Sequence, residues 1–531
     1  MQNKLPVAEW IAASARRTPH KAALRCNGQT LSYAALALRV EDAAAALAAA
    51  GVGRSACVAW LGRNSAEMLT MLFACARQGA MFMPQNWRMV PAEHRATLLE
   101  CPPALLCVDT GFVAASADHC IAPLSTRCVS LGSVPAGWTA WDDFLAAAGH
   151  AARPGAPPDM QRPRGAPPGA QTLLLLCWTS GSTGRPKGVL LSHAAIEANA
   201  DASVAMHALT PEDRVLTTLP LFHVGGLNIL TTPALREGCT VTLHAKFDAA
   251  ETLQAIESER ITLTVLVPAQ LEALLAHPRW ASTDLSSLRC ISTGSTLVPR
   301  RLIDVVHARG IPLIQVWGAT ETAPIAACLH ADEAWAKAGT TGRAAAGCEL
   351  RTVDALGLDT TPGACGEILV RSSCVMSGYW RAPAASAKAL EGGWFHSGDI
   401  GHLDAEGFLT IDGRLSDMII SGGENISPAE IERVLLDSPD IAEAAVIGRP
   451  DARWGEAVVA VLVPRAGATL THLQVLAFVE GRLARFKHPK HVLVVDTLPR
   501  TALGKIHKDA VRQLVAARIA TPSATAEEQS A

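Results

Sequence analysis

Apolar and polar positions alternate with two different periods along the first two thirds of the chain. Alanine-rich stretches with helical spacing, such as residues 32–51 and 66–79, are separated by short apolar runs such as residues 56–62 and 104–109. Strand-sized apolar runs between helical segments are typical of α/β layers. The same alternation returns between residues 171 and 346. The pattern therefore predicts an α/β fold with two layered αβ subdomains.

The pattern changes twice toward the C-terminus. Residues 348–411 contain short strand patterns separated by turns, which predict a small β-barrel-like subdomain that completes a large domain over residues 1–413. Helical and strand patterns then mix over residues 414–518, where a helix is expected at 472–484, and this predicts a smaller α+β domain. Residues 519–531 lack apolar periodicity and are expected to form a disordered tail.

Composition narrows the class of function. The 531-residue chain is 49% hydrophobic and carries a formal net charge of −3, which suits a globular enzyme and argues against nucleic acid or an anionic membrane as its main partner. No apolar stretch approaches the ~20 residues of a membrane span, and the first residues lack a signal-peptide pattern. The fourteen cysteines contain no CxxC pair and indicate free thiols. We expect a soluble cytoplasmic enzyme.

The loop WTSGSTGRPKG at residues 178–188 follows a strand-sized apolar run. Its glycines let backbone N–H groups converge on an anion, its hydroxyls can donate hydrogen bonds, and Lys187 adds positive charge. It is not a P-loop, because Lys187 stands between Pro186 and Gly188 where that motif requires Lys followed by Ser or Thr. The composition predicts a phosphate site, with a flexible surface hairpin as the alternative.

Three other charged residues lie in loops that would suit a nucleotide, although each has an ordinary structural explanation. Glu321 in QVWGATETAP could hold a divalent cation or be a solvated glutamate. Asp399 in a Gly-rich loop could accept hydrogen bonds from two ribose hydroxyls or be a turn residue. Lys505 precedes the last predicted helix, where a single lysine is ordinarily a solvated charge. Only the combination of these residues favours a nucleotide-binding site over the ordinary structural explanations.

Taken together, the motifs TSGSTGRPKG, WGATE, SGD, GRLSDMIISGGENISPAEIE and PRTALGK resemble, in the same order, those of the acyl-adenylate-forming superfamily. This superfamily includes acyl-CoA synthetases, peptide-synthetase adenylation domains and beetle luciferases. The resemblance extends from about Val7 to Leu514, and residues 416–435 are most similar to bacterial ligases that join aromatic or fatty acids to coenzyme A. It implies an acid–thiol ligase that forms an acyl-AMP from ATP and then transfers the acyl group to coenzyme A.

The resemblance also implies a role for each matching residue. Lys505 would be the catalytic lysine, His223 would act at the gate of the acyl pocket, and Glu321 would bind Mg²⁺. A hinge at Ser416 would make the C-terminal domain mobile between the two half-reactions. The residues expected to bind ATP are Thr179, Ser180, Gly181, Ser182, Thr183, Gly184, Lys187, Trp317, Gly318, Ala319, Thr320, Glu321, Asp399 and Arg414. The acyl pocket would contain His223, Val224, Gly225, Val265, Gly294, Ser295 and Ala323. Coenzyme A would contact Gly422, Gly423, Trp454, Phe486 and Lys487.

Two residues depart from the family's pattern. Trp317 stands where the family usually has Tyr beside the adenine, and Ser416 stands where the hinge is typically Asp or Lys. None of the implied acyl-pocket residues is cationic, which favours a neutral aromatic or fatty acid. Arg300 and Arg301 follow a predicted strand end and leave a second carboxylate on the substrate open.

Three alternatives compete with the ligase. The acyl group could pass to a carrier-protein phosphopantetheine, the chain could be a luciferase-like oxygenase, or it could bind a nucleotide without catalysis. No carrier domain is evident, the Ala/Arg bias looks bacterial, and the presence of both Lys505 and Glu321 argues against a noncatalytic protein. We therefore expect ATP, a carboxylic acid and coenzyme A as substrates, with Mg²⁺ accompanying ATP, and a homodimer is left open.

Overall fold

The computed structural model describes residues 5–114, 126–147, 168–179, 186–421, 424–451, 454–501 and 505–518. Several residues with expected roles lie outside these ranges, namely Ser180, Gly181, Ser182, Thr183, Gly184, Gly422 and Gly423, together with the tail 519–531. No helix in the described ranges is both long enough and apolar enough to span a membrane.

Helices form where the 3.6-residue pattern predicts them, and polar side chains fix several of their first turns. The Ser32 hydroxyl accepts a hydrogen bond from the Ala35 N–H at the start of α2, and α7 begins in the same way at Ser192. The helices of the large N-terminal part are α1 (Trp10–Arg17), α2 (Tyr33–Ala49), α3 (Ala66–Gln78), α4 (Pro91–Glu100), α6 (Trp141–Ala146), α7 (His193–His207), α8 (Val224–Gly226), α9 (Thr232–Glu237), α10 (Ala249–Ser258), α11 (Pro268–Ala276), α12 (Arg300–His307) and α13 (Pro383–Ala389).

One of the two layers is built on an eight-stranded sheet in the order β19-β9-β8-β4-β3-β5-β6-β7. Its central strands β3 and β4 are buried along their whole length, as continuous apolar runs require. Its strands are β3 (Cys57–Leu61), β4 (Met81–Gln85), β5 (Leu105–Val108), β6 (Arg127–Ser130), β7 (Thr139–Ala140), β8 (Leu173–Thr179), β9 (Lys187–Ser192) and β19 (Gly378–Tyr379).

The other layer is built on a nine-stranded sheet in the order β16-β15-β14-β13-β12-β10-β11-β1-β2. Its strands are β1 (Ala22–Cys26), β2 (Gln29–Ser32), β10 (Arg214–Thr217), β11 (Thr240–Leu243), β12 (Leu263–Val265), β13 (Cys290–Gly294), β14 (Leu313–Trp317), β15 (Ala327–Cys328) and β16 (Arg343–Ala344). Strands β10 to β14 are parallel neighbours, so their carboxyl ends lie along one edge. Two layers are therefore confirmed.

The two layers do not divide the chain where the sequence pattern does. Strands β1 and β2 come from the first αβ segment but extend the nine-stranded sheet, whereas β8 and β9 come from the second segment and extend the eight-stranded one. Periodicity along the sequence identifies a strand but not the distant strand with which it pairs. The sequence pattern therefore could not show that strands of each segment pair into the sheet of the other. One apolar core joins both layers and includes Trp10, Trp60 and Phe408.

The β-rich subdomain is a four-stranded antiparallel sheet. Its strands are β17 (Cys348–Val353), β18 (Gly366–Ser372), β20 (Phe395–Leu403) and β21 (Leu409–Arg414). Pairing of β20 with β21 sets Asp399 opposite Arg414, which brings two residues of the predicted nucleotide site together.

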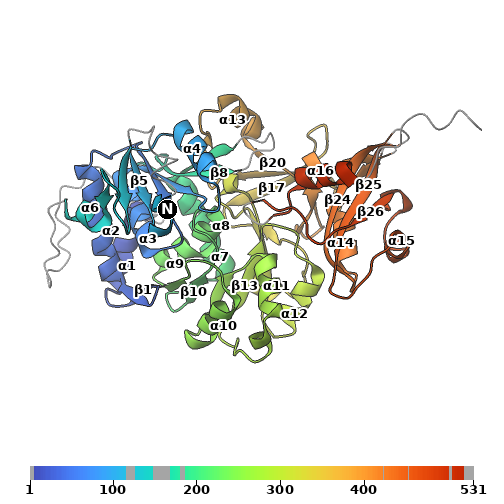
Figure 1. Cartoon of the computed structure of the whole chain (residues 1–531), viewed down its shortest axis with the longest axis horizontal. Helices are drawn as coiled ribbons and strands as arrows, with labels where there is room; N and C mark the ends of the chain where they lie inside the picture. Colours follow the sequence, from blue (N-terminus) through green and yellow to red (C-terminus); the bar gives the residue numbers. More distant parts are fainter. Residues whose placement is uncertain are drawn as a thin grey trace, which may run out of the picture.

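The C-terminal part has an α+β fold with apolar clusters of its own. It lies at the end of the molecule opposite the eight-stranded sheet (Figure 1). Neighbouring residues of its long strands enter alternate clusters: Val446 enters one and Ile447 the other. Its elements are β22 (Ile419–Ser421), β23 (Glu424–Ile426), α14 (Pro428–Leu436), β24 (Ile441–Asp451), β25 (Gly455–Pro464), α15 (His472–Val479), β26 (His491–Val494) and α16 (Lys508–Arg518).

The expected helix at 472–484 is shorter than its sequence pattern. Helix α15 ends at Val479, Glu480 takes extended backbone angles, and Gly481 has a φ of 73°. A glycine adopts this left-handed conformation without steric cost and commonly ends a helix. The apolar spacing continues past the glycine, which is why the pattern alone predicts a longer helix.

Candidate active site

The two ends of the predicted phosphate loop are held together by strand pairing. Thr179 ends β8 and Lys187 begins β9, and the two residues are opposite each other in the antiparallel register. The Thr179 hydroxyl donates to the Lys187 carbonyl oxygen at 3.3 Å. The ammonium of Lys187 lies 5.1 Å from the centre of the Tyr379 ring, a cation–π contact.

Tyr379 connects this strand end to Glu321. Its hydroxyl donates to Glu321 Oε1 at 2.9 Å, and the Met376 N–H donates to the Glu321 carbonyl oxygen at 2.8 Å. Burial and the neighbouring Glu321 charge raise the pKa of the Tyr379 hydroxyl, so it remains a donor. Sequence reasoning missed this residue. Its only signal is rarity, since Tyr33 and Tyr379 are the chain's two tyrosines.

Lys187, Tyr379 and Glu321 form one part of a charged cluster, and Asp399, Trp317 and Arg414 form the other. Two side chains hold the Asp399 carboxylate in place. It is 7% exposed, its Oδ2 accepts a hydrogen bond from the Trp317 indole N–H at 2.9 Å, and its Oδ1 lies 2.6 Å from Nε of Arg414. Burial raises the pKa of Asp399, while the Arg414 charge and the indole donor lower it. Trp317 therefore supplies a hydrogen bond at this site as well as a flat ring.

Lys505 of the C-terminal part reaches the same cluster. Its loop is closed by an isolated bridge between Arg500 and Ile506, and the Thr501 N–H donates to the Lys505 carbonyl oxygen at 2.7 Å. Burial, followed by the positive charge of Arg414, lowers the pKa of the Lys505 ammonium, and the carboxylates of Asp399 and Glu321 act in the opposite direction. These interactions place the lysine among the residues predicted to bind ATP.

His223 lies between this cluster and a group of aromatic side chains. Burial first, and then the positive charges of Lys505 and Arg88, lower the pKa of His223 to about 4, so the imidazole is neutral at neutral pH. Its ring meets Phe222 edge-on at 6.5 Å, and Phe222 meets Trp87 edge-on at 6.3 Å. Sequence reasoning also missed Trp87.

The remaining acyl-pocket candidates lie where parallel strands end. Val265 ends β12, Gly294 ends β13, and Ala323 follows β14, so all three are at the carboxyl edge of the nine-stranded sheet. Ligands of open α/β sheets bind at this edge. A Cβ atom on Gly294 would lie 2.3 Å from the Val316 carbonyl oxygen, so no larger residue fits without moving the backbone. The exposed Ser295 continues this strand end with a φ of 76°.

The two arginines left open for a second substrate carboxylate already have acidic partners. Arg300 Nε lies 2.9 Å from Asp304 Oδ1, and Arg301 pairs with Glu272. Both pairs belong to the α11–α12 region, and each guanidinium already has an acidic partner within the protein.

The predicted coenzyme A residues form an exposed part of the C-terminal surface. Trp454 and Phe486 are 38% and 41% exposed, although large aromatic side chains are usually well buried. The Lys487 ammonium contacts both carboxylate oxygens of Glu430, at 2.7 and 2.8 Å. A phosphate that binds Lys487 would therefore compete with Glu430. Ser416, the predicted hinge residue, is exposed between β21 and β22.

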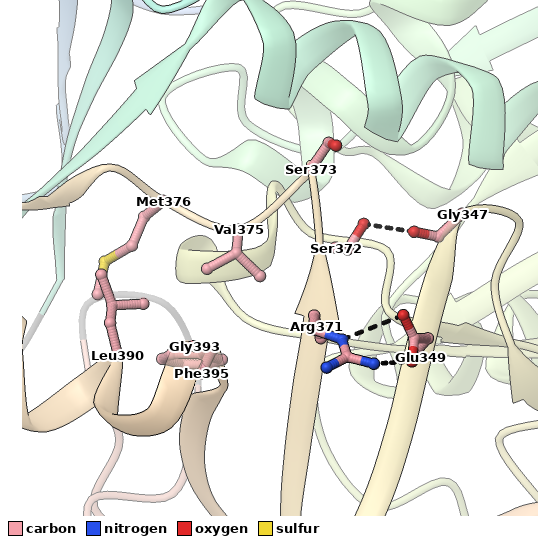
Figure 2. A pocket seen from close by; sticks show the side chains of 10 residues that line it. All are labelled: Gly347, Glu349, Arg371, Ser372, Ser373, Val375, Met376, Leu390, Gly393 and Phe395. Carbon is pink, nitrogen blue, oxygen red and sulfur yellow. Dashed lines mark hydrogen bonds and ion pairs between the residues drawn. The ribbon is translucent and has the colours of Figure 1, made fainter.

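A cavity of about 540 Å³ lies in the β-rich subdomain (Figure 2), and Met376, whose N–H donates to the Glu321 carbonyl oxygen, is part of its lining. Along its edge, Arg371 pairs with Glu349 and the Ser372 hydroxyl donates to the Gly347 carbonyl oxygen. It is lined by Gly347, Glu349, Arg371, Ser372, Ser373, Val375, Met376, Leu390, Gly393 and Phe395. None of the predicted site residues belongs to this lining.

Two family models together match most of the chain. The AMP-binding enzyme model matches residues 11–380, and the model of the AMP-binding enzyme C-terminal domain matches residues 430–505. The chain therefore belongs to the AMP-binding enzyme family, which confirms the resemblance carried by its motifs. It is an AMP-forming acid–CoA ligase by class.

Relatives and solved structures agree with this class. The chain is 56% identical to the indoleacetate–CoA ligase of Aromatoleum aromaticum over 96% of its length and 98% of that protein's. It is 40% identical to a feruloyl-CoA synthase of Amycolatopsis, with the same coverage. The o-succinylbenzoate CoA synthetase of Bacillus subtilis, solved with its acyl-adenylate intermediate, is 30% identical with a TM-score of 0.83 over 96% of this chain and 98% of that one. The amide bond synthetase of Marinactinospora thermotolerans is 30% identical with a TM-score of 0.86 over 96% and 99%.

Proposed function

We propose that this enzyme activates a neutral arylacetic acid with ATP and transfers the acyl group to coenzyme A. The observation that carries the acid class is the 56% identity to an indoleacetate–CoA ligase over nearly the full length of both chains. The acidic partners of Arg300 and Arg301 support a substrate without a second carboxylate. The neutral His223 and the aromatic rings beside it suit an apolar acid. A cytoplasmic location and a homodimer stay predictions.

The first half-reaction brings two anions together, and the charged cluster meets that requirement. The substrate carboxylate attacks the α-phosphate of ATP, its oxygen forms the new P–O bond, and pyrophosphate leaves. Lys187, Arg414 and Lys505 supply positive charge around the phosphates, and Asp399 accepts hydrogen bonds from the ribose hydroxyls. Preorganised charges in a site of low dielectric stabilise such a transition state strongly.

Glu321 is the residue that fits Mg²⁺. Its carboxylate is an oxygen ligand of the kind this ion takes, and Tyr379 holds one of the two oxygens by a hydrogen bond. A bound Mg²⁺ supplies positive charge beside the phosphates of ATP. The protein's part is to hold the carboxylate of Glu321 in place through Tyr379.

Removing the Tyr379 hydroxyl should weaken this support. We expect Tyr379→Phe to raise the Mg²⁺ concentration for half-maximal pyrophosphate release by about 10-fold, because a lost partner of a metal ligand typically costs that much affinity. Tyr33→Phe is the matched control, since the Tyr33 hydroxyl donates to the Cys239 carbonyl oxygen far from the cluster. An identical Mg²⁺ dependence in wild type and Tyr379→Phe would remove Tyr379 from the metal site.

The second half-reaction needs a path for a thiol to the acyl carbon. The coenzyme A sulfur attacks that carbon and AMP leaves with its phosphate oxygen. Movement about Ser416 withdraws Lys505 and opens the path, while Trp454 and Phe486 offer exposed rings for the adenine. The exposure of these rings and of Ser416 supports this assignment.

A substrate panel tests the proposal directly. Pyrophosphate and AMP release should be measured with indole-3-acetate, phenylacetate, ferulate, benzoate, octanoate and o-succinylbenzoate, each with and without coenzyme A. We expect kcat/KM for an arylacetate to exceed that of the other classes by about 10-fold or more, as a misfit of one or two carbons costs about 1–3 kcal/mol. Preference for a fatty or dicarboxylic acid would contradict the acid class. ADP in place of AMP would contradict adenylation itself.

The acceptor needs its own comparison. With the best acid, free coenzyme A, a phosphopantetheinylated carrier protein and a primary amine should be offered in parallel. The amine is included because an amide bond synthetase has a similar fold. Thioester with free coenzyme A is the expected product, and preference for either alternative would contradict the ligase assignment while preserving the acyl-AMP step.

A further inference from the structure

Three potential metal ligands meet beside the domain junction, and adenylation uses none of them. Cys365 Sγ donates to Asp412 Oδ2 at 3.2 Å, and His402 Nδ1 lies 2.6 Å from the same oxygen. The sulfur, the ring nitrogen and a carboxylate oxygen all lie within 4.8 Å of one another. Cys365 is exposed, His402 is half-buried and Asp412 is buried, so the group is accessible from one side.

The sheet brings these residues together by register. Cys365 immediately precedes β18, and the pairing of Gly366 with Gly401 sets Cys365 beside His402 on β20. On the next strand, Gly401 pairs with Ile411 but Ile400 pairs with Gly413, so Asp412 is the extra residue of a β-bulge. A bulge redirects a side chain that regular pairing would point elsewhere.

Thiolate, imidazole and carboxylate together form a donor set for a late first-row transition metal. Zinc takes these ligands at about 2.0–2.3 Å in a tetrahedral arrangement, which corresponds to ligand–ligand separations of about 3.3–3.8 Å. The 3.2 Å between Cys365 Sγ and Asp412 Oδ2 is close to these separations, whereas the 2.6 Å between His402 Nδ1 and the same oxygen is a hydrogen-bond distance that would lengthen when a metal replaces the proton. Mg²⁺ and Ca²⁺ prefer all-oxygen sites and would not select a sulfur and a nitrogen.

We propose that Cys365, His402 and Asp412 form a binding site for Zn²⁺ or a similar divalent transition metal, with water as the fourth ligand. A nucleophilic triad does not fit the same atoms. In such a triad the imidazole bridges the nucleophile and the carboxylate through its two nitrogens. Here the thiol and His402 Nδ1 both meet one oxygen of Asp412, so the imidazole is not between them.

The site lies at the base of the hinge. Asp412 precedes Arg414 by two residues and Ser416 by four, and its carbonyl oxygen accepts a hydrogen bond from the Ser427 hydroxyl of the C-terminal part. A metal here would cross-link three neighbouring strands just before the chain leaves the large domain. It would be separate from the Mg²⁺ that accompanies ATP.

Cobalt is a suitable probe because its absorption reports its ligands. Untagged protein, with ATP and Mg²⁺ absent, should be titrated with Co²⁺, followed by displacement with Zn²⁺. We expect one equivalent to bind with a thiolate-to-cobalt charge-transfer band and the intense visible bands of a tetrahedral site. Cys365→Ser should abolish the charge-transfer band, and His402→Ala should weaken binding at least ~10-fold.

Cys26→Ser is the matched control, since Cys26 is another incompletely buried thiol on a distant strand, and it should leave the titration unchanged. A measurement on the wild-type chain guards against misfolded variants: Zn²⁺ should protect Cys365 from alkylation by iodoacetamide, as followed by peptide mass spectrometry. Wild-type protein without a charge-transfer band, equal Co²⁺ affinity in all variants, or unprotected Cys365 would each overturn the proposal. Failure here would leave the ligase assignment untouched, because neither test uses substrate turnover.

Discussion

Lys505→Ala should lower the rate of acyl-AMP formation by about 10²–10³, the usual cost of removing one preorganised donor from a transition state. The same variant should convert synthetic acyl-AMP and coenzyme A to thioester at close to the wild-type rate. The reason is that Lys505 interacts with the charges of Arg414, Asp399 and Glu321. In the proposed mechanism, negative charge gathers on the phosphates there, and not at the carbon that the thiol attacks. Both half-reactions should be measured by single turnover, because product release can hide the chemical step.

Lys388→Ala is a suitable control for this experiment. Lys388 is an exposed lysine in the last turn of α13 and should affect neither half-reaction. A Lys505→Ala variant that folds but loses both half-reactions equally would show that the lysine does not act selectively in adenylation. The case for two working arrangements of the C-terminal part would then lose its main support.

Asp399→Ala should raise the KM for ATP by roughly 10- to 100-fold, with a smaller effect on the KM for the acid. A hydrogen bond to a charged group contributes about 1.5–3 kcal/mol, and the buried carboxylate is the expected acceptor for two ribose hydroxyls. Its removal also leaves the Trp317 indole N–H and the Arg414 guanidinium without this partner. Initial rates of pyrophosphate release over a range of ATP concentrations measure the change.

Asp399→Asn separates the contribution of charge from that of shape. The amide keeps one acceptor oxygen and nearly the same volume, so its KM for ATP should fall between those of wild type and Asp399→Ala. Circular dichroism and the Tm establish that each variant is folded. If the KM for ATP stays unchanged in folded Asp399→Ala, the residue has only a structural role on β20, as the partner of Trp317 and Arg414.

Local features of the fold were predictable from the sequence because local spacing determines them. The helical period of residues 33–49 and the apolar run of β3 each depend on neighbours within one element. The assignment of strands to sheets was not predictable in this way. Strand β1 pairs with β11, more than two hundred residues away, and nothing in the five residues of β1 specifies that partner.

The residues of the candidate site likewise fall into those that the sequence predicted and those that only the structure revealed. Lys187, Glu321, Asp399 and Lys505 belong to ordered motifs, so the resemblance selects them before any geometry is known. Tyr379 contacts two of them but lies in a two-residue strand, and its part emerges only from the pairing of β19 with β9. The metal-ligand cluster was equally invisible, because its three residues are spread over 48 positions and meet through a β-bulge.

The proximity of Lys505 to Arg414 bears on when Lys505 enters and leaves the site during the proposed reaction. Burial and repulsion by the Arg414 charge lower the pKa of the Lys505 ammonium, while the carboxylates of Asp399 and Glu321 act in the opposite direction. A polyanionic nucleotide relieves this repulsion, so its arrival favours the arrangement in which Lys505 is docked. Departure of pyrophosphate removes most of that negative charge and restores the repulsion. In the proposed mechanism, the reaction's own change in charge would therefore favour the docked lysine until the phosphate bond is broken and favour its withdrawal afterwards.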